Sequence, residues 1–376
     1  MTDCLSMPEL ASIHFRVGAS LQNADGSESP GFAGAISGIS NEAYIIAGGA
    51  NFLDRMPWEG GKKAYSDRIF VFERSGRELI EAKETTMNLP EPIAYCGSVS
   101  TEYGIVYAGG ESEQGLSSNA FIMSWDISAR KMEVKTLPPL PLALAGVSLT
   151  RIGPVVYALG GDGIRESSAA LFSINLSLPI RVWERLPDMP RPAAYMAALA
   201  QDSPAGFQLY AIGGRAKTTS GISELYSDTL AYHPETKRWT ELQPISDEGR
   251  RISLSAGAAL ALGTRSIVLL GGDDGTVFHQ IETYFARIAS AADAGEKATL
   301  TEEKNQLVTK HPGFYKGILH YDTFVNRWTR IAESPYPVPV CTSASLWGHE
   351  LLIPSGETRP GKRSPDIICG SIGFHH

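Results

Sequence analysis

One stretch near the C-terminus combines residue types that could do chemistry together: Ser-Gly-Glu-Thr-Arg-Pro-Gly-Lys-Arg, residues 355–363. Pro360-Gly361 fits the two central positions of a type II turn, which reverses the chain. That reversal predicts Arg363 beside Glu357. A carboxylate among guanidinium groups can carry a proton, and a bidentate arginine can hold a substrate carboxylate. From the spacing alone, however, an exposed ion pair worth about 0–1 kcal/mol is the better interpretation.

A short apolar strand that ends in glycine recurs along the chain and indicates which elements position these residues. Counted at the last glycine, successive copies are 61, 51, 53, 58 and 84 residues apart. Four of these spacings lie near the kelch period of about 50 residues, so the fifth must contain an insertion. The repeat predicts an all-β fold, a six-bladed kelch-type β-propeller, with four antiparallel strands in each blade. The copies lie at 44–49, 105–110, 155–161, 209–214, 267–272 and 351–356.

We expect one propeller domain over residues 1–376, closed by its own N-terminus. The sixth unit lacks a fourth strand, and a lone strand at 11–19 precedes the first unit. Pairing these two would leave no sheet edge open, whereas the alternative is a loose tail at 1–30. The expected blades are 31–90, 91–140, 141–190, 191–245, 246–335, and 336–376 together with 11–19.

The 84-residue spacing predicts a helical insertion in blade five, at 276–312. Apolar residues recur at helical spacing from Val277 to Ile288. Thr299 with Glu302 is typical of a capping box that opens a second helix. Long inserts in compact folds are usually functional, so a lid or wall over the propeller mouth is favoured over a surface ornament.

The composition disfavours several classes of function. A net charge of −8 argues against a nucleic-acid partner, and no apolar run reaches the ~18–20 residues of a membrane span. The eight histidines show no metal-binding spacing and no glycine-rich phosphate loop is present, so we expect no metal and no cofactor. No protein partner is evident.

The cysteines and the N-terminus bear on the compartment. The four cysteines form no CxxC pair, and we expect free thiols. The first residues have neither the basic region nor the apolar core of a signal peptide. This predicts a cytoplasmic location, or a periplasmic one if an export signal was removed.

Four stretches of the chain resemble the N-acetylneuraminate mutarotase (sialic acid epimerase) family of six-bladed kelch propellers. They are 31–52, 59–72, the insert from Phe278 to Lys316, and 355–363. The resemblance covers essentially the whole chain in shifted order, as in the circularly permuted branch of that family. It implies an isomerase of carbohydrate metabolism that interconverts the α and β anomers of sialic acid (N-acetylneuraminate) by general acid/base catalysis.

The resemblance also implies roles for particular residues. The family's proposed catalytic pair lies in a GE-x-[KR]-P-G-x-R loop, whose positions here are Glu357 and Arg363. It implies that Glu357 is the acid/base and that Arg363 binds the C1 carboxylate of the sugar. The family often has an arginine where this chain has Ile93. Further candidate substrate-binding residues on mouth-facing loops, each with a structural role as the equal alternative, are Lys63, Glu111 and Arg191.

Two other functions stay open. A non-catalytic kelch interaction module would bind a protein partner across its loops, with a flat apolar rim and no enclosed charged pocket. An epimerase or mutarotase of another acidic sugar would use the same proton chemistry. A copper oxidase is disfavoured because no Tyr, His and Cys ligand set is evident.

Overall fold

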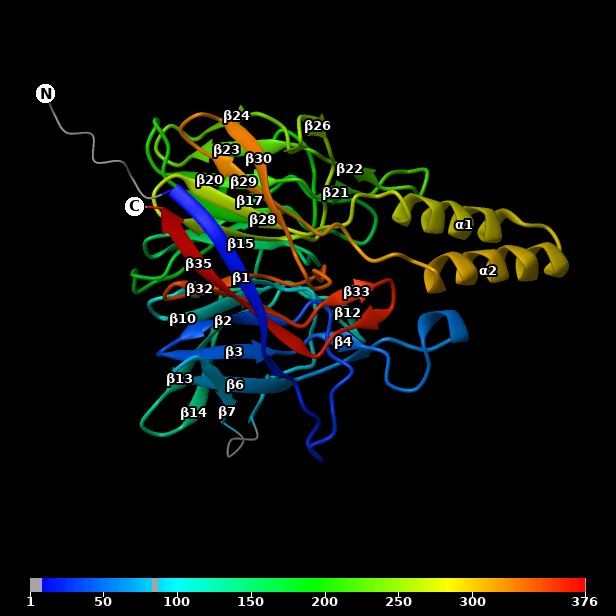
Figure 1. Cartoon of the computed structure of the whole chain (residues 1–376), viewed down its shortest axis with the longest axis horizontal. Helices are drawn as coiled ribbons and strands as arrows, with labels where there is room; N and C mark the ends of the chain where they lie inside the picture. The colour runs from blue at the N-terminus through cyan, green and yellow to red at the C-terminus, as the bar shows by residue number, and fades with distance from the viewer. Residues whose placement is uncertain (1–8, 83–86, 376) are drawn as a thin grey trace, which may run out of the picture.

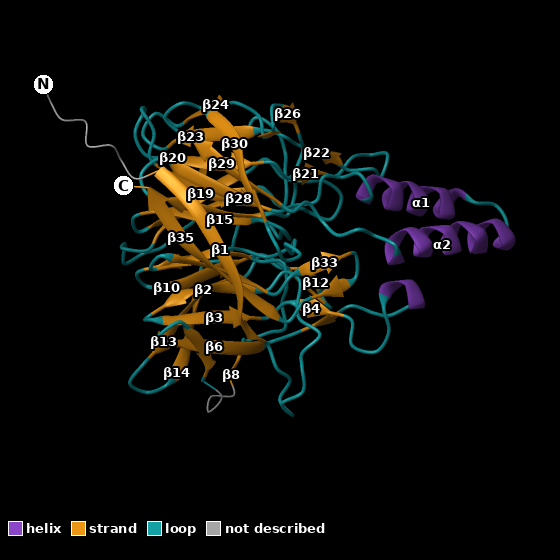
Figure 2. Cartoon of the chain, viewed as in Figure 1, coloured by secondary structure: helices purple, strands orange, loops and turns teal. Residues whose placement is uncertain are grey.

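Six antiparallel sheets make up the body of the protein in a computed structural model, which describes residues 9–82 and 87–375 (Figure 1). Strands dominate and the two α-helices lie at one side (Figure 2). The structure confirms the all-β, six-bladed β-propeller. Residues 1–8, which include Cys4 and the first part of the N-terminal stretch considered for a signal peptide, lie outside the described part of the chain. The described cysteines Cys96, Cys341 and Cys369 are free thiols, as expected.

The first three blades are built from consecutive strands. Blade one contains β2 (Ile36–Ser40), β3 (Ala43–Ala47), β6 (Arg68–Ser75) and β7 (Glu78–Glu81), with β8 (Met87–Asn88) also paired to β6. Blade two contains β9 (Gly97–Thr101), β10 (Gly104–Ala108), β13 (Ala120–Asp126) and β14 (Lys131–Leu137). Blade three contains β15 (Ser148–Ile152), β16 (Val155–Leu159), β17 (Leu171–Asn175) and β18 (Glu184–Leu186).

The last three blades follow the same plan, except at the closure. Blade four contains β19 (Ala197–Gln201), β20 (Gln208–Ile212), β23 (Thr229–His233) and β24 (Arg238–Glu241). Blade five contains β27 (Ala258–Leu262), β28 (Ser266–Leu270), β29 (Gly317–Asp322) and β30 (Arg327–Glu333). Blade six contains β31 (Ser345–Trp347), β32 (Glu350–Pro354), β35 (Asp366–His375) and the N-terminal β1 (Glu9–Ser20).

The two ends of the chain close the propeller. β1 pairs antiparallel with β35, from Glu9 opposite His375 to Ser20 opposite Asp366. The strand predicted at 11–19 therefore completes blade six, and the alternative of a loose tail is wrong for residues 9–20. Because every blade then has its fourth strand, no sheet is left one strand short.

A closed circuit of six backbone hydrogen bonds surrounds the axis. In each blade, a residue two to four positions before the innermost strand has a left-handed backbone, with φ between 52° and 66°. The amide N–H of each donates to the carbonyl oxygen of its counterpart in the preceding blade, at 2.7–3.1 Å, and blade one closes onto blade six. We call these residues the axial ring. They are Gly34, Tyr95, Gly146, Tyr195, Ala256 and Cys341.

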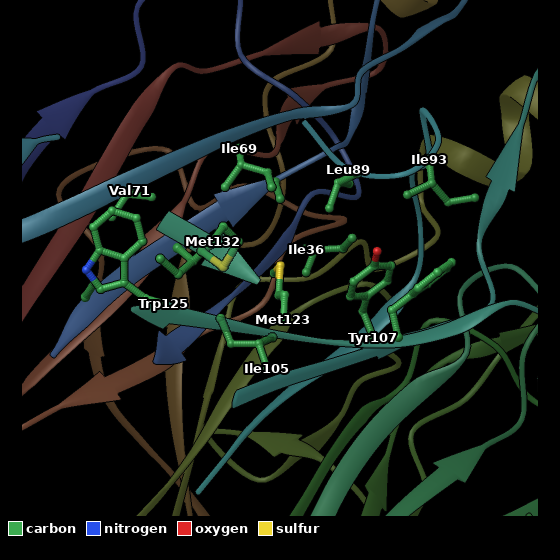
Figure 3. Packing of buried hydrophobic residues seen from close by; sticks show 14 of the residues in the cluster. Ile36, Ile69, Val71, Leu89, Ile93, Ile105, Tyr107, Met123, Trp125 and Met132 are labelled. Atoms are coloured by element: carbon green, nitrogen blue, oxygen red, sulfur yellow. The ribbon is translucent and has the colours of Figure 1, made fainter. Parts of the chain in front are cut away.

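Apolar side chains fill the space between neighbouring blades. Figure 3 shows Ile36 and Ile69 of blade one facing Ile105, Met123 and Trp125 of blade two. All five are buried, and burying a side chain of this size contributes roughly 1.5–3 kcal/mol. Blades are thus held side by side by hydrophobic packing, while the axial ring sets their inner ends.

Short two-stranded hairpins and the helical insert occupy one face of the propeller (Figure 1). The insert consists of α1 (Phe278–Ser290) and α2 (Ala294–Thr309), which confirms the predicted helical insertion in blade five. No helix in the described residues has the length and apolar character needed to cross a membrane. The hairpins are β4 (Ala50–Asn51) with β5 (Ala64–Tyr65), β11 (Glu111–Ser112) with β12 (Gly115–Leu116), β21 (Arg215–Ala216) with β22 (Glu224–Leu225), β25 (Ser246–Asp247) with β26 (Arg250–Arg251), and β33 (Glu357–Arg359) with β34 (Lys362–Arg363).

The predicted N-cap of the second helix, Thr299, lies six residues after the observed one. Its N-cap is Asp293, whose carboxylate accepts a hydrogen bond from the backbone N–H of Glu296 at 2.9 Å. Thr299 lies inside the helix, and its hydroxyl donates to the carbonyl of Gly295. The capping-box pattern was therefore accidental, because an aspartate upstream already satisfies the first free amide.

The axial ring predicts a stability effect. A Cβ at Gly146 would lie 2.5 Å from Cε2 of Tyr195, at a φ of +62° that disfavours side chains. We expect Gly146→Ala to lower the free energy of unfolding by about 1–3 kcal/mol, measured by urea denaturation. Ala256→Gly is the control, since Ala256 already has a left-handed backbone; its stability should stay within about 1 kcal/mol of wild type. Equal stability of Gly146→Ala and wild type would contradict the importance of this packing.

Candidate active site

The hairpin β33–β34 brings a carboxylate and a guanidinium group together. Glu357 lies opposite Arg363 in the pairing, and Pro360-Gly361 form the connection. Gly361 has φ +82°, as the third position of a type II turn requires, and its N–H donates to Oε1 of Glu357 at 3.0 Å. Nη2 of Arg363 lies 3.0 Å from Oε2 of Glu357. Both carboxylate oxygens are therefore held by the hairpin itself.

This pair is buried rather than exposed. The Arg363 side chain is 4% exposed and that of Glu357 18%, so the exposed ion pair favoured by spacing alone is wrong. The Arg363 guanidinium also lies over the ring of Phe52, 4.7 Å from its centre. Within the described residues, its Nε and Nη1 atoms are buried and have no hydrogen-bond partner. Buried donors without a partner are costly, so an acceptor from a ligand would be stabilised here.

Burial dominates the electrostatics of Glu357. It raises the pKa of this carboxyl above its ordinary value, although the charge of Arg363, the Gly361 N–H and the charge of Lys63 all favour the ionised form. A pKa shifted toward neutral pH suits a group that must both accept and donate a proton.

The position of Glu357 belongs to a six-fold pattern. In every blade, the residue directly after the last glycine exchanges two backbone hydrogen bonds with the residue that precedes the axial-ring residue. The six post-glycine residues are therefore arranged around the axis. They are Ala50, Glu111, Asp162, Arg215, Asp273 and Glu357. Asp162, Arg215 and Asp273 were missed in the sequence, where their shared place after the glycine pair was the available signal.

Lys63 and Glu111 meet beside the pair. Nζ of Lys63 lies 2.7 Å from Oε1 of Glu111, which also accepts a hydrogen bond from the Tyr65 hydroxyl at 2.9 Å. The same ammonium group lies over the ring of Tyr95, 4.8 Å from its centre. Because its charge lowers the pKa of Glu357, Lys63 faces the Glu357–Arg363 pair as well.

A second buried pair comes from blades three and four. Nη2 of Arg215 lies 2.9 Å from Oδ2 of Asp162, and its guanidinium lies over the ring of Tyr195, 4.9 Å from the centre. Lys217 donates from Nζ to the carbonyl of Gly163 at 2.7 Å. Charges of both signs therefore converge around the axial ring.

Asp273 differs from the other carboxylates at the post-glycine positions. Oδ1 accepts from the N–H of Gly275 at 2.8 Å, but no basic group in the described residues forms an ion pair with it. Burial raises the pKa of Asp273 to about 6, and the negative charges of Asp274 and Glu357 act in the same direction. The charge of the nearby His279 acts in the opposite direction and lowers the pKa of Asp273.

Arg191 is held elsewhere. Its Nε lies 3.0 Å from Oδ2 of Asp228, and Nη2 lies 3.7 Å from Glu241 on the outermost strand of blade four. These contacts tie it to the scaffold, and its role in substrate binding stays a prediction. Ile93 is also structural, since it is buried between blades one and two.

The helical insert is anchored on both sides of the site. From α2, Nδ2 of Asn305 donates to the carbonyl of Trp58, in the short helix η1 (Pro57–Glu59). On α1, the carboxylate of Glu282 accepts from the backbone N–H and the hydroxyl of Ser223, at 2.8 and 2.7 Å. The insert thus connects loops of blades one and four.

A cavity of about 530 Å³ follows the propeller axis through the inner strands. The axial ring lines one end of it, and hydroxyl groups of residues such as Ser98, Ser148 and Ser343 line its wall. Glu357 and Arg363 do not line it. Within residues 9–82 and 87–375, no three His, Cys, Asp or Glu side chains gather closely enough to hold a metal ion.

The sequence profile of a family described as N-acetylneuraminate epimerase matches residues 137–375, a range that includes Glu357 and Arg363. The chain belongs to the N-acetylneuraminate epimerase family. A permuted order of blades stays a prediction, and a match confined to residues 137–375 is what such an order would give.

Curated relatives carry the same family name. The N-acetylneuraminate epimerase of Haemophilus influenzae (strain 86-028NP) is 23% identical over 239 residues, 63% of this chain and 60% of that protein. That of Brucella melitensis biotype 1 is 24% identical over 251 residues, covering 65% and 61%. That of Salmonella typhimurium (strain LT2) is 27% identical over 238 residues, covering 62% and 57%. This member of the N-acetylneuraminate epimerase family thus spans about 60% of the length of these relatives.

The raised pKa of Asp273 predicts a pH-dependent stability difference. Because the folded-state pKa is about 6 and the ordinary value is 3.8, the stabilising contribution of the proton is present below pH 3.8 and lost as the pH rises through 6. Asp273→Asn is neutral at every pH and can still accept from Gly275. We expect it to match wild type at acidic pH and to be more stable at pH 8 by on the order of 2 kcal/mol, measured by urea denaturation.

The exposed neighbour provides the control for this measurement. Asp274→Asn removes a carboxylate one residue away and should give a much smaller difference between the two pH values. A stability of Asp273→Asn that parallels wild type from pH 4 to pH 8 would rule out an unfavourable buried charge at this position.

Proposed function

We propose that this protein interconverts the α and β anomers of N-acetylneuraminate at C2 by general acid/base catalysis. One observation carries the proposal. A buried arginine, Arg363, holds the carboxylate of Glu357 with one nitrogen and leaves Nε and Nη1 without a partner. One of these two nitrogens, together with the second N–H of Nη2, forms a planar fork that matches the two oxygens of a substrate carboxylate. Family membership and the names of the relatives support the same sugar acid.

The chemistry needed is modest. Arg363 holds the C1 carboxylate, and Glu357 takes the proton of the anomeric hydroxyl on C2. The bond between C2 and the ring oxygen then breaks, the ring oxygen is protonated, and the open keto form can close on either face. Because this exchange also proceeds without help in water, an acceleration of about 10²–10⁴ is what one positioned carboxylate can supply.

The surroundings of the pair favour an enzyme over a non-catalytic interaction module. A module would present a flat apolar rim, whereas this mouth contains buried charged groups and a guanidinium group with unsatisfied donors. Lys63 and Glu111 are kept as candidate substrate-binding residues because Lys63 faces the pair. Another acidic sugar would make the same contacts with Arg363, so the choice of sugar rests on the family.

Glu357→Gln is the direct test of the proton carrier. Glutamine keeps the shape, and its amide oxygen can still accept from Gly361 or Arg363, but it cannot carry the proton. We expect anomer exchange of N-acetylneuraminate, followed by NMR, to slow by about 10²-fold or more, toward the spontaneous rate. The exposed Glu113→Gln, on a loop of blade two, is the control and should keep wild-type exchange. Unaltered exchange in folded Glu357→Gln protein would refute the assignment.

Arg363→Lys tests the carboxylate clamp. Lysine keeps the charge but loses the planar fork, so binding of the sugar should weaken about tenfold or more, while the exchange rate at saturation falls less. The measurement is the dependence of exchange on sugar concentration. Arg359→Lys, an exposed arginine on the same hairpin, is the matched control and should bind as wild type does. Equal affinity of the two variants would argue against a bidentate contact.

A further inference from the structure

Asp273 and Glu357 occupy the same structural position on adjacent blades. Asp273 exchanges two backbone hydrogen bonds with Ser255, and Glu357 does so with Val340. The residues that follow Ser255 and Val340 are consecutive members of the axial ring, joined by a hydrogen bond of 3.1 Å. The two carboxylates are therefore set beside each other by backbone geometry, although they are separated by the helical insert in the sequence.

Asp273 is half-buried and its second carboxylate oxygen is free. Oδ1 accepts from Gly275, and in the described part of the chain Oδ2 has no hydrogen-bond partner. The charged or titratable groups that face it are Asp274 on its own loop, His279 in the first turn of α1, and Glu357 on blade six. The other three carboxylates that directly follow the last glycine of a blade, those of Glu111, Asp162 and Glu357, each form an ion pair with a basic side chain.

Ring opening requires two proton transfers in opposite directions. A base must remove the proton of the anomeric hydroxyl while an acid delivers one to the ring oxygen, and these two oxygens are bonded to the same carbon. Two neighbouring carboxyl groups with different surroundings meet this need, because an adjacent cation favours the ionised form of one, and the other, without an ion-pair partner, takes up a proton more readily.

We propose that Asp273 is a second catalytic residue, which protonates the ring oxygen while Glu357 deprotonates the anomeric hydroxyl. This inference rests on the proposed mutarotase function. In the opening step, the hydroxyl on C2 passes its proton to Glu357, the electrons of that O–H bond form the second bond of the C2 carbonyl, and the bond between C2 and the ring oxygen breaks. The ring oxygen takes the proton of the Asp273 carboxyl. Closure on the other face reverses each transfer, so both residues regain their starting states.

The pH profile provides a readout that a structural role would not move. If Asp273 supplies a proton, wild-type exchange falls as the pH rises above about 6, because the protonated acid disappears. Asp273→Asn should lower the exchange rate at pH 6 by about 10²-fold and remove this alkaline limb. Binding of N-acetylneuraminate, measured by calorimetry, should remain because Asn keeps the volume and the acceptor for Gly275.

Two further variants keep the test decisive. Asp273→Glu retains an acid one methylene away, so it should keep an alkaline limb at a reduced rate, which also covers the case in which Asp273→Asn fails to fold. Asp274→Asn is the matched control. It should keep the wild-type exchange rate and the fall of that rate at alkaline pH. Wild-type rate and an unchanged limb in Asp273→Asn, or loss of the limb in Asp273→Glu, would overturn the inference.

The outcome also separates this inference from the proposed function. If wild type does not accelerate anomer exchange, the mutarotase function fails as a whole. If Glu357→Gln abolishes exchange while Asp273→Asn leaves its rate and pH profile unchanged, only the role of Asp273 is lost, and Glu357 acts as the single proton carrier.

Discussion

The axial ring of six backbone hydrogen bonds is the constraint on which the site depends. It joins one residue of each blade to its counterpart in the next, and four of these six residues adopt a left-handed backbone without being glycine. Each such residue costs roughly 1–2 kcal/mol, an expense that persists only when the surroundings impose it. The residue before each ring member pairs with the residue that follows the last glycine of the repeat. The ring thereby fixes the backbone positions from which the side chains of the candidate site extend.

Burial around this ring explains the chemistry. Carboxylates removed from water prefer their protonated forms, while nearby cations return them toward ionisation. Glu357 has Arg363 as such a cation, whereas Asp273 has no ion-pair partner in the described residues. One rigid scaffold therefore presents carboxyl groups with different proton affinities within the same mouth. Because backbone hydrogen bonds hold these positions, little reorganisation is needed when a substrate binds.

The helical insert adds an enclosing element that a regular propeller lacks. It projects from the face that holds the short hairpins (Figure 1) and is attached near Trp58 on one side and at Ser223 on the other. Its first turn also places His279 beside Asp273. The insert thus contributes to the electrostatics of the candidate site as well as to its wall.

The sequence by itself determined the features that depend on local conformation. Glycine-ended strands at a period near 50 residues specify six blades, and Pro360-Gly361 specifies a reversal that brings Arg363 to Glu357, because both signals act within a few residues. Tertiary structure alone decided that this pair is buried and that Asp273 lies beside it. Burial and charge neighbours arise when segments 50 or more residues apart meet around the axis, and that meeting depends on ring closure and packing between blades rather than on any local pattern.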